Sequence, residues 1–205
     1  MNGVRKALAI TAGLILLAGK PVTMAAKVVP TIIATTCSAC HGAVGVSFDP
    51  RFPNLAGQGS AYLIREIRDF QDHRRADPLA QSIMWPMVQY IQQNQIDKVA
   101  RYFADQTIAP GVKQNAKLAT TGRRIYMSGI ASVHLPACAG CHGTTGRGIP
   151  PLFPELAGQQ RLYVVTQLHY FKTKERTGPL GIMSTVATKL SKKQMAAVAA
   201  FIRTL

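Results

Sequence analysis

The chain has 205 residues, 47% of them hydrophobic and 16% charged, a composition that excludes a disordered or fibrous protein. Its length suits one large domain or two small ones. With 24 Lys and Arg against 9 Asp and Glu, the net charge is +15, which suits a nucleic acid, an anionic membrane or an acidic protein as partner. The 4 cysteines are too few for a disulfide scaffold, so their spacing has to indicate what they do.

The first 25 residues are predicted to be an export signal. Arg5 and Lys6 precede an apolar run at 7–18, and Thr23-Met24-Ala25 supplies the small residues of a cleavage site. The run is 12 residues long, whereas a membrane span needs roughly 20. We therefore expect residues 1–25 to be a cleaved signal peptide and the rest of the chain to be periplasmic. Peripheral association with the inner membrane is left open.

The remaining chain repeats itself. Cys37–Gly42 returns as Cys138–Gly143, and Phe52–Gln58 returns at the same offset as Phe153–Gln159. Further matches pair Tyr62, Phe70, Arg75, Pro78, Leu79 and Met84 with Tyr163, Phe171, Arg176, Pro179, Leu180 and Met183. Two copies related this regularly indicate two domains of one fold.

The breaker Pro110-Gly111, within the stretch 105–111, marks the connection between the copies. We expect the first domain at residues 26–107, a linker at 108–116 and the second domain at 117–205.

Apolar residues in both copies recur at helical spacing, as at 62–70 and 96–103 in the first copy. Strand-like alternation is absent, so the predicted fold class is all-α, with two tandem domains. Ser191 is expected to cap the last helix. The second copy opens with a predicted helix at 118–130, whereas the first has only the short segment Thr31–Thr35, so its opening helix is truncated.

Each copy contains the motif C-x-x-C-H, which is typical of covalent haem attachment. Two thiols one helical turn apart reach the two vinyl groups of one porphyrin, and the adjacent histidine can then bind the iron. A zinc ribbon would bring its cysteine pairs within about 15 to 20 residues of each other, and a redox disulfide would lie in a βαβ unit. Neither context is present, so we predict two haem c groups, on Cys37 and Cys40 and on Cys138 and Cys141.

The second axial ligand determines what such a haem can do. An open iron permits oxygen or peroxide chemistry, whereas a methionine closes the iron for electron transfer. Met84 and Met183 are the methionines that occupy equivalent positions in both copies, which favours ligation over core packing. Met87 is the competing candidate in the first copy, but its counterpart is Val186.

These motifs resemble the dihaem cytochrome c4 family over essentially the whole chain after residue 25. The resemblance implies two class I cytochrome c domains about a pseudo-twofold axis, with haems close enough to exchange electrons. It further implies periplasmic transfer from a quinol-oxidising complex or other donor to an acceptor such as a terminal oxidase. By the same resemblance, the iron ligands are His41 and Met84 in the first domain and His142 and Met183 in the second, and the carbonyls of Pro53 and Pro154 accept the histidine Nδ1–H.

Two further expectations concern the conformation of the chain at Met84 and the remaining polar residues. Because Trp85-Pro86 follows Met84 and proline restricts the preceding chain, we expect Met84 on extended chain or a loop. The remaining polar candidates are expected to be solvated surface groups: His73, His134, His169, the pair Arg74-Arg75 and the pair Lys192-Lys193.

The positive charge belongs to the second copy. Residues 26–110 carry eight bases and seven acids, whereas residues 111–205 carry thirteen bases and two acids. No nucleic-acid motif is present, and an exported cytochrome rarely meets nucleic acid, so we expect an acidic redox protein or an anionic membrane surface as partner. The candidate docking residues are Lys113, Lys117, Arg123, Arg124, Lys172, Lys174, Lys189, Lys192 and Lys193.

Two classes of function are consistent with two haems. The paired methionines and the lack of any catalytic constellation predict an electron carrier rather than an enzyme. The alternative is a cytochrome subunit of an oxidoreductase complex, such as a flavin-containing sulfur-compound dehydrogenase; a peroxidase-like enzyme would need an open iron.

Overall fold

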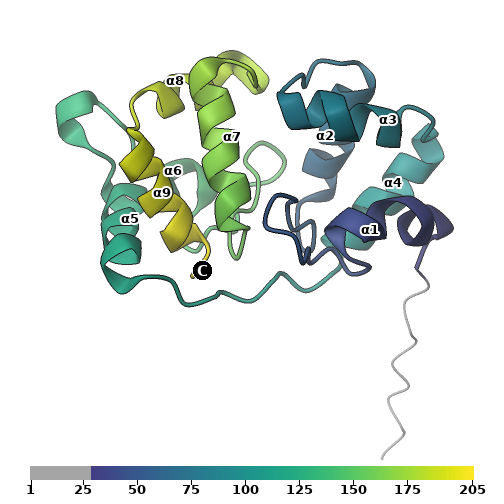
Figure 1. Cartoon of the computed structure of the whole chain (residues 1–205), viewed down its shortest axis with the longest axis horizontal. Coiled ribbons are helices and arrows are strands. Elements are labelled where there is room, and N and C mark those ends of the chain that lie inside the picture. Colours follow the sequence, from purple (N-terminus) through teal and green to yellow (C-terminus); the bar gives the residue numbers. More distant parts are fainter. Residues whose placement is uncertain (1–28) are drawn as a thin grey trace, which may run out of the picture.

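The computed structural model describes residues 29–205, so the predicted signal peptide lies outside the described residues. Within this range the chain is helical, and its extended pairing is limited to the isolated bridges Ile130–Leu135 and Ile149–Phe153. The helices form two groups that lie side by side, with the connecting segment running along one edge (Figure 1). The predicted all-α class with two tandem domains is confirmed. None of the helices of residues 29–205 is both long and apolar enough to cross a membrane.

The first group is built around the crossing of two amphipathic helices, α2 and α4. Its elements are η1 (Ile33–Cys37), α1 (Ser38–His41), α2 (Ser60–Gln71), η2 (Ala80–Met84), α3 (Trp85–Val88) and α4 (Gln93–Ala104), where η1 and η2 are π-helical. The buried residues form two clusters, one around Phe103 and one around Ile96. The predicted short opening segment is part of one helical stretch that continues to His41.

The second group has an additional long helix before its cysteines. Its elements are α5 (Ala116–Ser128), η3 (Ala131–Val133), α6 (Ala139–His142), α7 (Arg161–Thr173), η4 (Pro179–Gly181), α8 (Ile182–Thr188) and α9 (Lys192–Ile202). Ser191 caps α9 as predicted: its hydroxyl accepts a hydrogen bond from the Gln194 amide, and the Gln194 side chain accepts one from the Ser191 amide.

Helix α5 crosses α9 closely because a glycine lies at the crossing. A Cβ atom on Gly122 would lie 1.9 Å from the carbonyl oxygen of Ala197. Beside this contact Tyr126 packs edge-on against Phe201 at 5.3 Å, and its hydroxyl donates to the Gly143 carbonyl at 2.8 Å. The described part of the first domain has no counterpart of α5. There a tyrosine of α4 makes a comparable hydrogen bond: the Tyr102 hydroxyl donates to the Ala43 carbonyl at 3.0 Å.

Met84 lies on a helix, so the expectation of a loop or extended chain is wrong. It ends η2 with helical dihedral angles (φ −75°, ψ −36°), and Trp85 continues in the same conformation. The proline that follows does not break the chain here: Pro86 is the second residue of α3, which continues directly from η2.

The Gly122 crossing can be tested by substitution. Gly122→Val should lower the free energy of unfolding of the second domain by about 2 kcal/mol, because the added atoms overpack the contact with α9. Denaturant unfolding followed by circular dichroism measures this loss. Gly140→Ala is the control, since a Cβ there meets no atom within 4 Å. Equal losses from both substitutions would contradict the packing argument.

Candidate haem sites

Each C-x-x-C-H motif winds into a single helical turn that ends at its histidine. Cys40 and His41 lie on α1, with Cys37 just before it, and His41 is buried. The Nδ1 atom of His41 lies 3.0 Å from the carbonyl oxygen of Pro53. Burial lowers the pKa of His41, which outweighs the opposing effect of the Pro53 hydrogen bond. A neutral ring with Nδ1–H donated to a carbonyl leaves Nε2 free to bind a metal.

The second motif repeats this geometry. Cys141 and His142 lie on α6, Cys138 precedes it, and His142 Nδ1 is 3.0 Å from the carbonyl oxygen of Pro154. Burial again lowers the pKa of His142. The sequence resemblance placed these two proline carbonyls beside the two histidines, and the structure brings them to the same distance in both domains.

The glycine that follows each histidine turns the chain back toward it. Gly42 and Gly143 have φ angles of 76° and 77°, a conformation that favours glycine. A Cβ atom on Gly42 would lie 2.2 Å from the carbonyl oxygen of Val46. The sharp reversal lets the following loop return to place Pro53 on His41.

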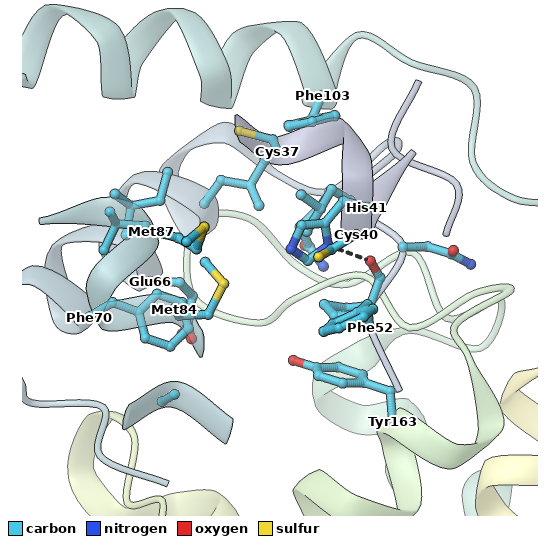
Figure 2. Close-up of a pocket in the computed structure, with 18 of the residues that line it drawn as sticks. Cys37, Cys40, His41, Phe52, Glu66, Phe70, Met84, Met87, Phe103 and Tyr163 are labelled. Carbon is cyan, nitrogen blue, oxygen red and sulfur yellow. Dashed lines mark hydrogen bonds between the residues drawn. The ribbon is translucent and has the colours of Figure 1, made fainter. Parts of the chain in front are cut away.

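The first motif opens into an apolar cavity with methionines on its far side. Figure 2 shows Cys40 and His41 on one side of the cavity and Met84 and Met87 across from them. Met84 packs against the cluster around Ile96, whereas Met87 is 46% exposed. The other walls are mostly aliphatic and aromatic, including Leu63, Ile67, Phe70, Val88, Val99 and Phe103.

The donor groups of this cavity fit a haem. They are two free thiols, one neutral imidazole and a thioether, in apolar surroundings. Residues 29–205 hold no group of three or more His, Cys, Asp or Glu side chains that could bind a bare metal ion. A porphyrin would supply the apolar contacts that this cavity lacks as well as the iron.

Met183 occupies the corresponding place in the second domain. It lies in the first turn of α8 and follows Ile182, the first residue of that helix. Gly181, before Ile182, has a left-handed conformation. Its partly buried side chain packs against the core cluster that also contacts Cys138. Met183 and Cys138 thus pack against one core in the second domain, and Met84, Cys37 and Cys40 line one cavity in the first.

Two glutamines join the domains in a reciprocal arrangement. The side chain of Gln58 donates to the carbonyl of Glu155 at 3.0 Å and accepts from its amide at 2.9 Å. The side chain of Gln159 donates to the carbonyl of Asn54 at 2.9 Å and accepts from its amide at 2.8 Å. Because Gln58 corresponds to Gln159 and Asn54 to Glu155 in the repeat, these bonds display the pseudo-twofold axis.

Two arginines extend the same symmetry. Arg75 lies 3.4 Å from the hydroxyl of Tyr163, and Arg176 lies 3.1 Å from the hydroxyl of the equivalent Tyr62. Burial raises the pKa of Tyr62 to about 12, so its hydroxyl stays a neutral acceptor for the Arg176 guanidinium. Each arginine also lies over a phenylalanine of its own domain.

One carboxylate breaks the symmetry at the centre of this cluster. Glu66 Oε2 lies 2.6 Å from Arg75 and 2.8 Å from Arg176, so it bridges the two domains. The equivalent residue in the second domain is the neutral Gln167, which accepts from both arginines at 3.0 and 2.7 Å. Burial acts to raise the pKa of Glu66, but the two arginines prevail and hold it below its usual value.

Arg75 corrects one of the sequence predictions. We expected the Arg74-Arg75 pair to be solvated, which is right for Arg74 and wrong for Arg75, whose side chain is only 11% exposed. The signal that could have found it was its repetition as Arg176. His73, His134 and His169 are exposed as expected, although His73 also stacks on Trp85 at 3.9 Å.

Comparison with known proteins follows the same division into two halves. The Cytochrome c family model matches residues 27–106 and again residues 119–205. The chain is 37% identical to cytochrome c4 of Pseudomonas aeruginosa, over 84% of this chain and 85% of that protein. The chain belongs to the cytochrome c4 family. Two covalent haem c groups, on the four cysteines, therefore follow as predicted.

Other members of the cytochrome c4 family and its neighbours are also similar. The structure of cytochrome c4 from Acidithiobacillus ferrooxidans matches with a TM-score of 0.77 at 36% identity, covering 82% of this chain and 98% of that one. The thiosulfate dehydrogenase electron acceptor of Thiomonas intermedia is 33% identical, over 81% of this chain and 76% of that protein. The resemblance drawn from the sequence is confirmed, and the chain is an electron-transfer protein of this family.

The bridging carboxylate makes stability depend on pH. Glu66→Gln should lower the free energy of unfolding by about 3 kcal/mol at neutral pH, because it leaves the buried Arg176 guanidinium without its counter-charge and leaves Arg75 with Asp77 alone. Because the pKa of Glu66 is depressed, its contribution is present above the usual Glu value of about 4.3 and is lost as pH falls further. Denaturant unfolding at several pH values measures both effects.

The control for this experiment is Asp72→Asn, which removes an exposed carboxylate paired with Arg74. We expect it to change the free energy of unfolding by less than about 0.5 kcal/mol. A Glu66→Gln protein that keeps the acid-induced loss of stability in full would contradict the assignment.

Proposed function

We propose that the chain is a periplasmic dihaem carrier of single electrons between a respiratory donor, such as a quinol-oxidising complex, and an acceptor such as a terminal oxidase. The observation that supports it best is the facing of an oriented, neutral histidine and a methionine across an apolar cavity in the first domain, with the same residues repeated in the second. When bound, the haem irons supply the one-electron redox change. The export signal and the periplasmic location are part of this proposal.

The proposed iron ligands are His41 and Met84 in the first domain and His142 and Met183 in the second. Pro53 and Pro154 would hold the histidine rings through Nδ1, which raises the basicity of Nε2. With a histidine and a methionine bound to each iron, neither iron would offer a site to oxygen or peroxide. This supports a carrier over an enzyme.

The interface would bring the two haems into electron exchange. Asn54 directly follows Pro53, and Glu155 directly follows Pro154, so each glutamine of the reciprocal pairs holds the chain next to a histidine-binding carbonyl. Residues of the second domain, among them Pro154, Gln159 and Tyr163, also line the cavity of the first domain.

The division into domains at 26–107 and 117–205 with a linker at 108–116 belongs to this proposal.

The second domain is the proposed docking side for an acidic partner. Its basic residues gather at the end where α7 stops and α9 starts, since the Lys172 ammonium donates to the carbonyl of Leu190, next to the N-cap of α9. The bases of this end are Lys172, Lys174, Lys189, Lys192 and Lys193. None of their counterparts in the first domain is a lysine or an arginine: these are Gln71, His73, Tyr90, Gln93 and Asn94.

Two of these lysines oppose local helix stability. Lys192 and Lys193 stand in the first turn of α9, where the helix dipole disfavours cations. Both are exposed and neither has an acidic partner at salt-bridge distance among the described residues. A role in steering a negatively charged protein accounts for their presence, and an anionic membrane surface is the competing occupant.

A second candidate function is a cytochrome subunit of an oxidoreductase complex, such as a flavin-containing sulfur-compound dehydrogenase. The observation that favours it is the similarity to a protein named as the electron acceptor of thiosulfate dehydrogenase. Purification of the chain from its native source distinguishes the two: a stable complex that contains flavin supports the subunit, and an isolated dihaem protein supports the carrier.

Axial ligation is tested by single methionine variants of the haem-loaded protein. Met84→Ala and Met183→Ala should each halve the near-infrared sulfur-to-iron band of the ferric protein and allow carbon monoxide to bind one ferrous haem. Met87→Ala is the matched control and should leave both signals unchanged, because Met87 points into the same cavity but is half-exposed. Loss of the band in Met87→Ala instead would make that residue the ligand.

Docking is tested by charge reversal on opposite domains. The triple change Lys174→Glu, Lys192→Glu and Lys193→Glu should slow reduction by an acidic plant-type ferredoxin at least tenfold at low salt. Stopped-flow absorbance measures the rate, and the difference should vanish at high salt because screening removes the attraction.

The matched control reverses three exposed bases of the first domain: Arg68, Lys98 and Arg101. Both triple variants have the same net charge, so only the position of the change differs. Equal losses of rate from the two sets would rule out a preferred docking domain.

A further inference from the structure

Glu155 places a buried carboxyl group between the two haem sites. It directly follows Pro154, whose carbonyl oxygen is 3.0 Å from His142 Nδ1, and its side chain lines the cavity that holds His41 and the first cysteine pair. The side chain is only 9% exposed. A charge at this position is therefore felt at both sites, and most directly in the cavity of the first.

This carboxyl group lacks the partners that a buried carboxylate needs. Its Oε1 atom is buried and accepts no hydrogen bond from any group of residues 29–205. Arg147 is the cation at salt-bridge distance, 3.4 Å away, and its own side chain is 61% exposed. Burial of an ionised carboxylate whose one counter-ion is largely solvated favours the neutral acid.

The other charged groups that line the same cavity are already paired. Glu66 and Asp77 bind Arg75, and Arg51 binds Asp49. Arg147, on the loop that follows α6, is therefore the charge that opposes protonation of Glu155, and it connects the buried carboxyl group with solvent.

The equivalent position in the first domain shows which form of Glu155 fits. Asn54 is a neutral amide whose Oδ1 accepts from the Ser47 amide at 2.9 Å and whose Nδ2 donates to the Gly158 carbonyl at 2.9 Å. Glu155 Oε2 lies beside Gly57, the repeat counterpart of Gly158: a Cβ atom there would be 3.4 Å from it. A protonated Glu155 has a donor to offer at this place, as the amide does, whereas the carboxylate has none.

Burial also brings the titration of this group into the neutral range. It raises the pKa of Glu155 to about 7, and Arg147 acts in the opposite direction. Near neutral pH a small change in local potential therefore changes how much of the group is protonated.

We propose that Glu155 is a proton-binding site that couples haem reduction to the uptake of one proton. As one electron from the donor converts ferric to ferrous iron, the site loses one positive charge, and the Glu155 carboxylate takes one proton from water to become a carboxylic acid. On reoxidation the electron leaves to the acceptor and the proton returns to solvent. This proposal rests on the dihaem carrier proposed above.

The test is the pH dependence of the reduction potentials of the intact haem-loaded protein, measured by spectroelectrochemical titration. In the wild type the potential of at least one haem should fall as pH rises through about 7. Glu155→Gln should abolish this fall. The matched control is Glu175→Gln, which removes an exposed carboxylate of the same domain and should leave the fall in place.

Two further measurements separate proton binding from a structural role. Arg147→Gln should move the fall in potential to higher pH, because it removes the charge that lowers the pKa of Glu155. Infrared difference spectra should show a protonated carboxyl band appearing on reduction of the wild type and absent from Glu155→Gln.

A fall in potential that persists unchanged in Glu155→Gln would place the proton elsewhere, for example on a haem propionate, and overturn the proposal. So would potentials of the wild type that do not depend on pH in this range. If Glu155→Gln does not fold, the shift of the potential curve in Arg147→Gln and the infrared band of the wild type test the proposal instead. Absence of both signals overturns the proposal. Carbon monoxide binding to the wild type would instead contradict the carrier function itself.

Discussion

The reciprocal hydrogen bonds of Gln58 and Gln159 are the constraint on which the rest of the structure depends. An amide side chain is both donor and acceptor, so each glutamine satisfies the amide and the carbonyl of one residue in the other domain. These groups are buried at Asn54 and partly buried at Glu155, and leaving a buried one unpaired costs more than the bond itself contributes. The residues so held adjoin the prolines that orient the histidines, which makes the domain interface and the two haem sites parts of one arrangement.

The two halves share their ligand geometry and differ in the charges around it. His41 and His142 have the same distances to their prolines, yet Glu66 faces the neutral Gln167 and the neutral Asn54 corresponds to Glu155. The interior of the interface thus carries one unmatched carboxylate from each domain, one of them ion-paired and the other almost alone. Duplication supplied two equal sites, and a few substitutions made their electrostatic surroundings unequal.

The sequence predicted what depends on local pattern and missed what depends on the other half of the molecule. The repeat, the helical periodicity and the C-x-x-C-H spacing led to the helical tandem fold and the haems, because these are encoded within each copy. Arg75 looked like a surface residue because its partners include Glu66 of α2 and the neutral Gln167 of the opposite domain, neither of which is close to it in the sequence. Glu155 carries no local sign of burial, and only its place opposite Gln58 reveals it. The helical conformation of Met84 was missed because the restriction before a proline is a local tendency, whereas here η2 and α3 form one helical stretch through Trp85 and Pro86.

Among residues 29–205 the first domain has no counterpart of α5, and this gives the two domains different degrees of independence. The second domain closes its own core, in which α5 and α9 cross at Gly122. The first domain, in its described residues, has two smaller clusters, and part of its cavity wall is contributed by Pro154, Gln159 and Tyr163. The second domain thus encloses its core with its own helices, whereas the first domain borrows part of the wall around its haem cavity from its neighbour.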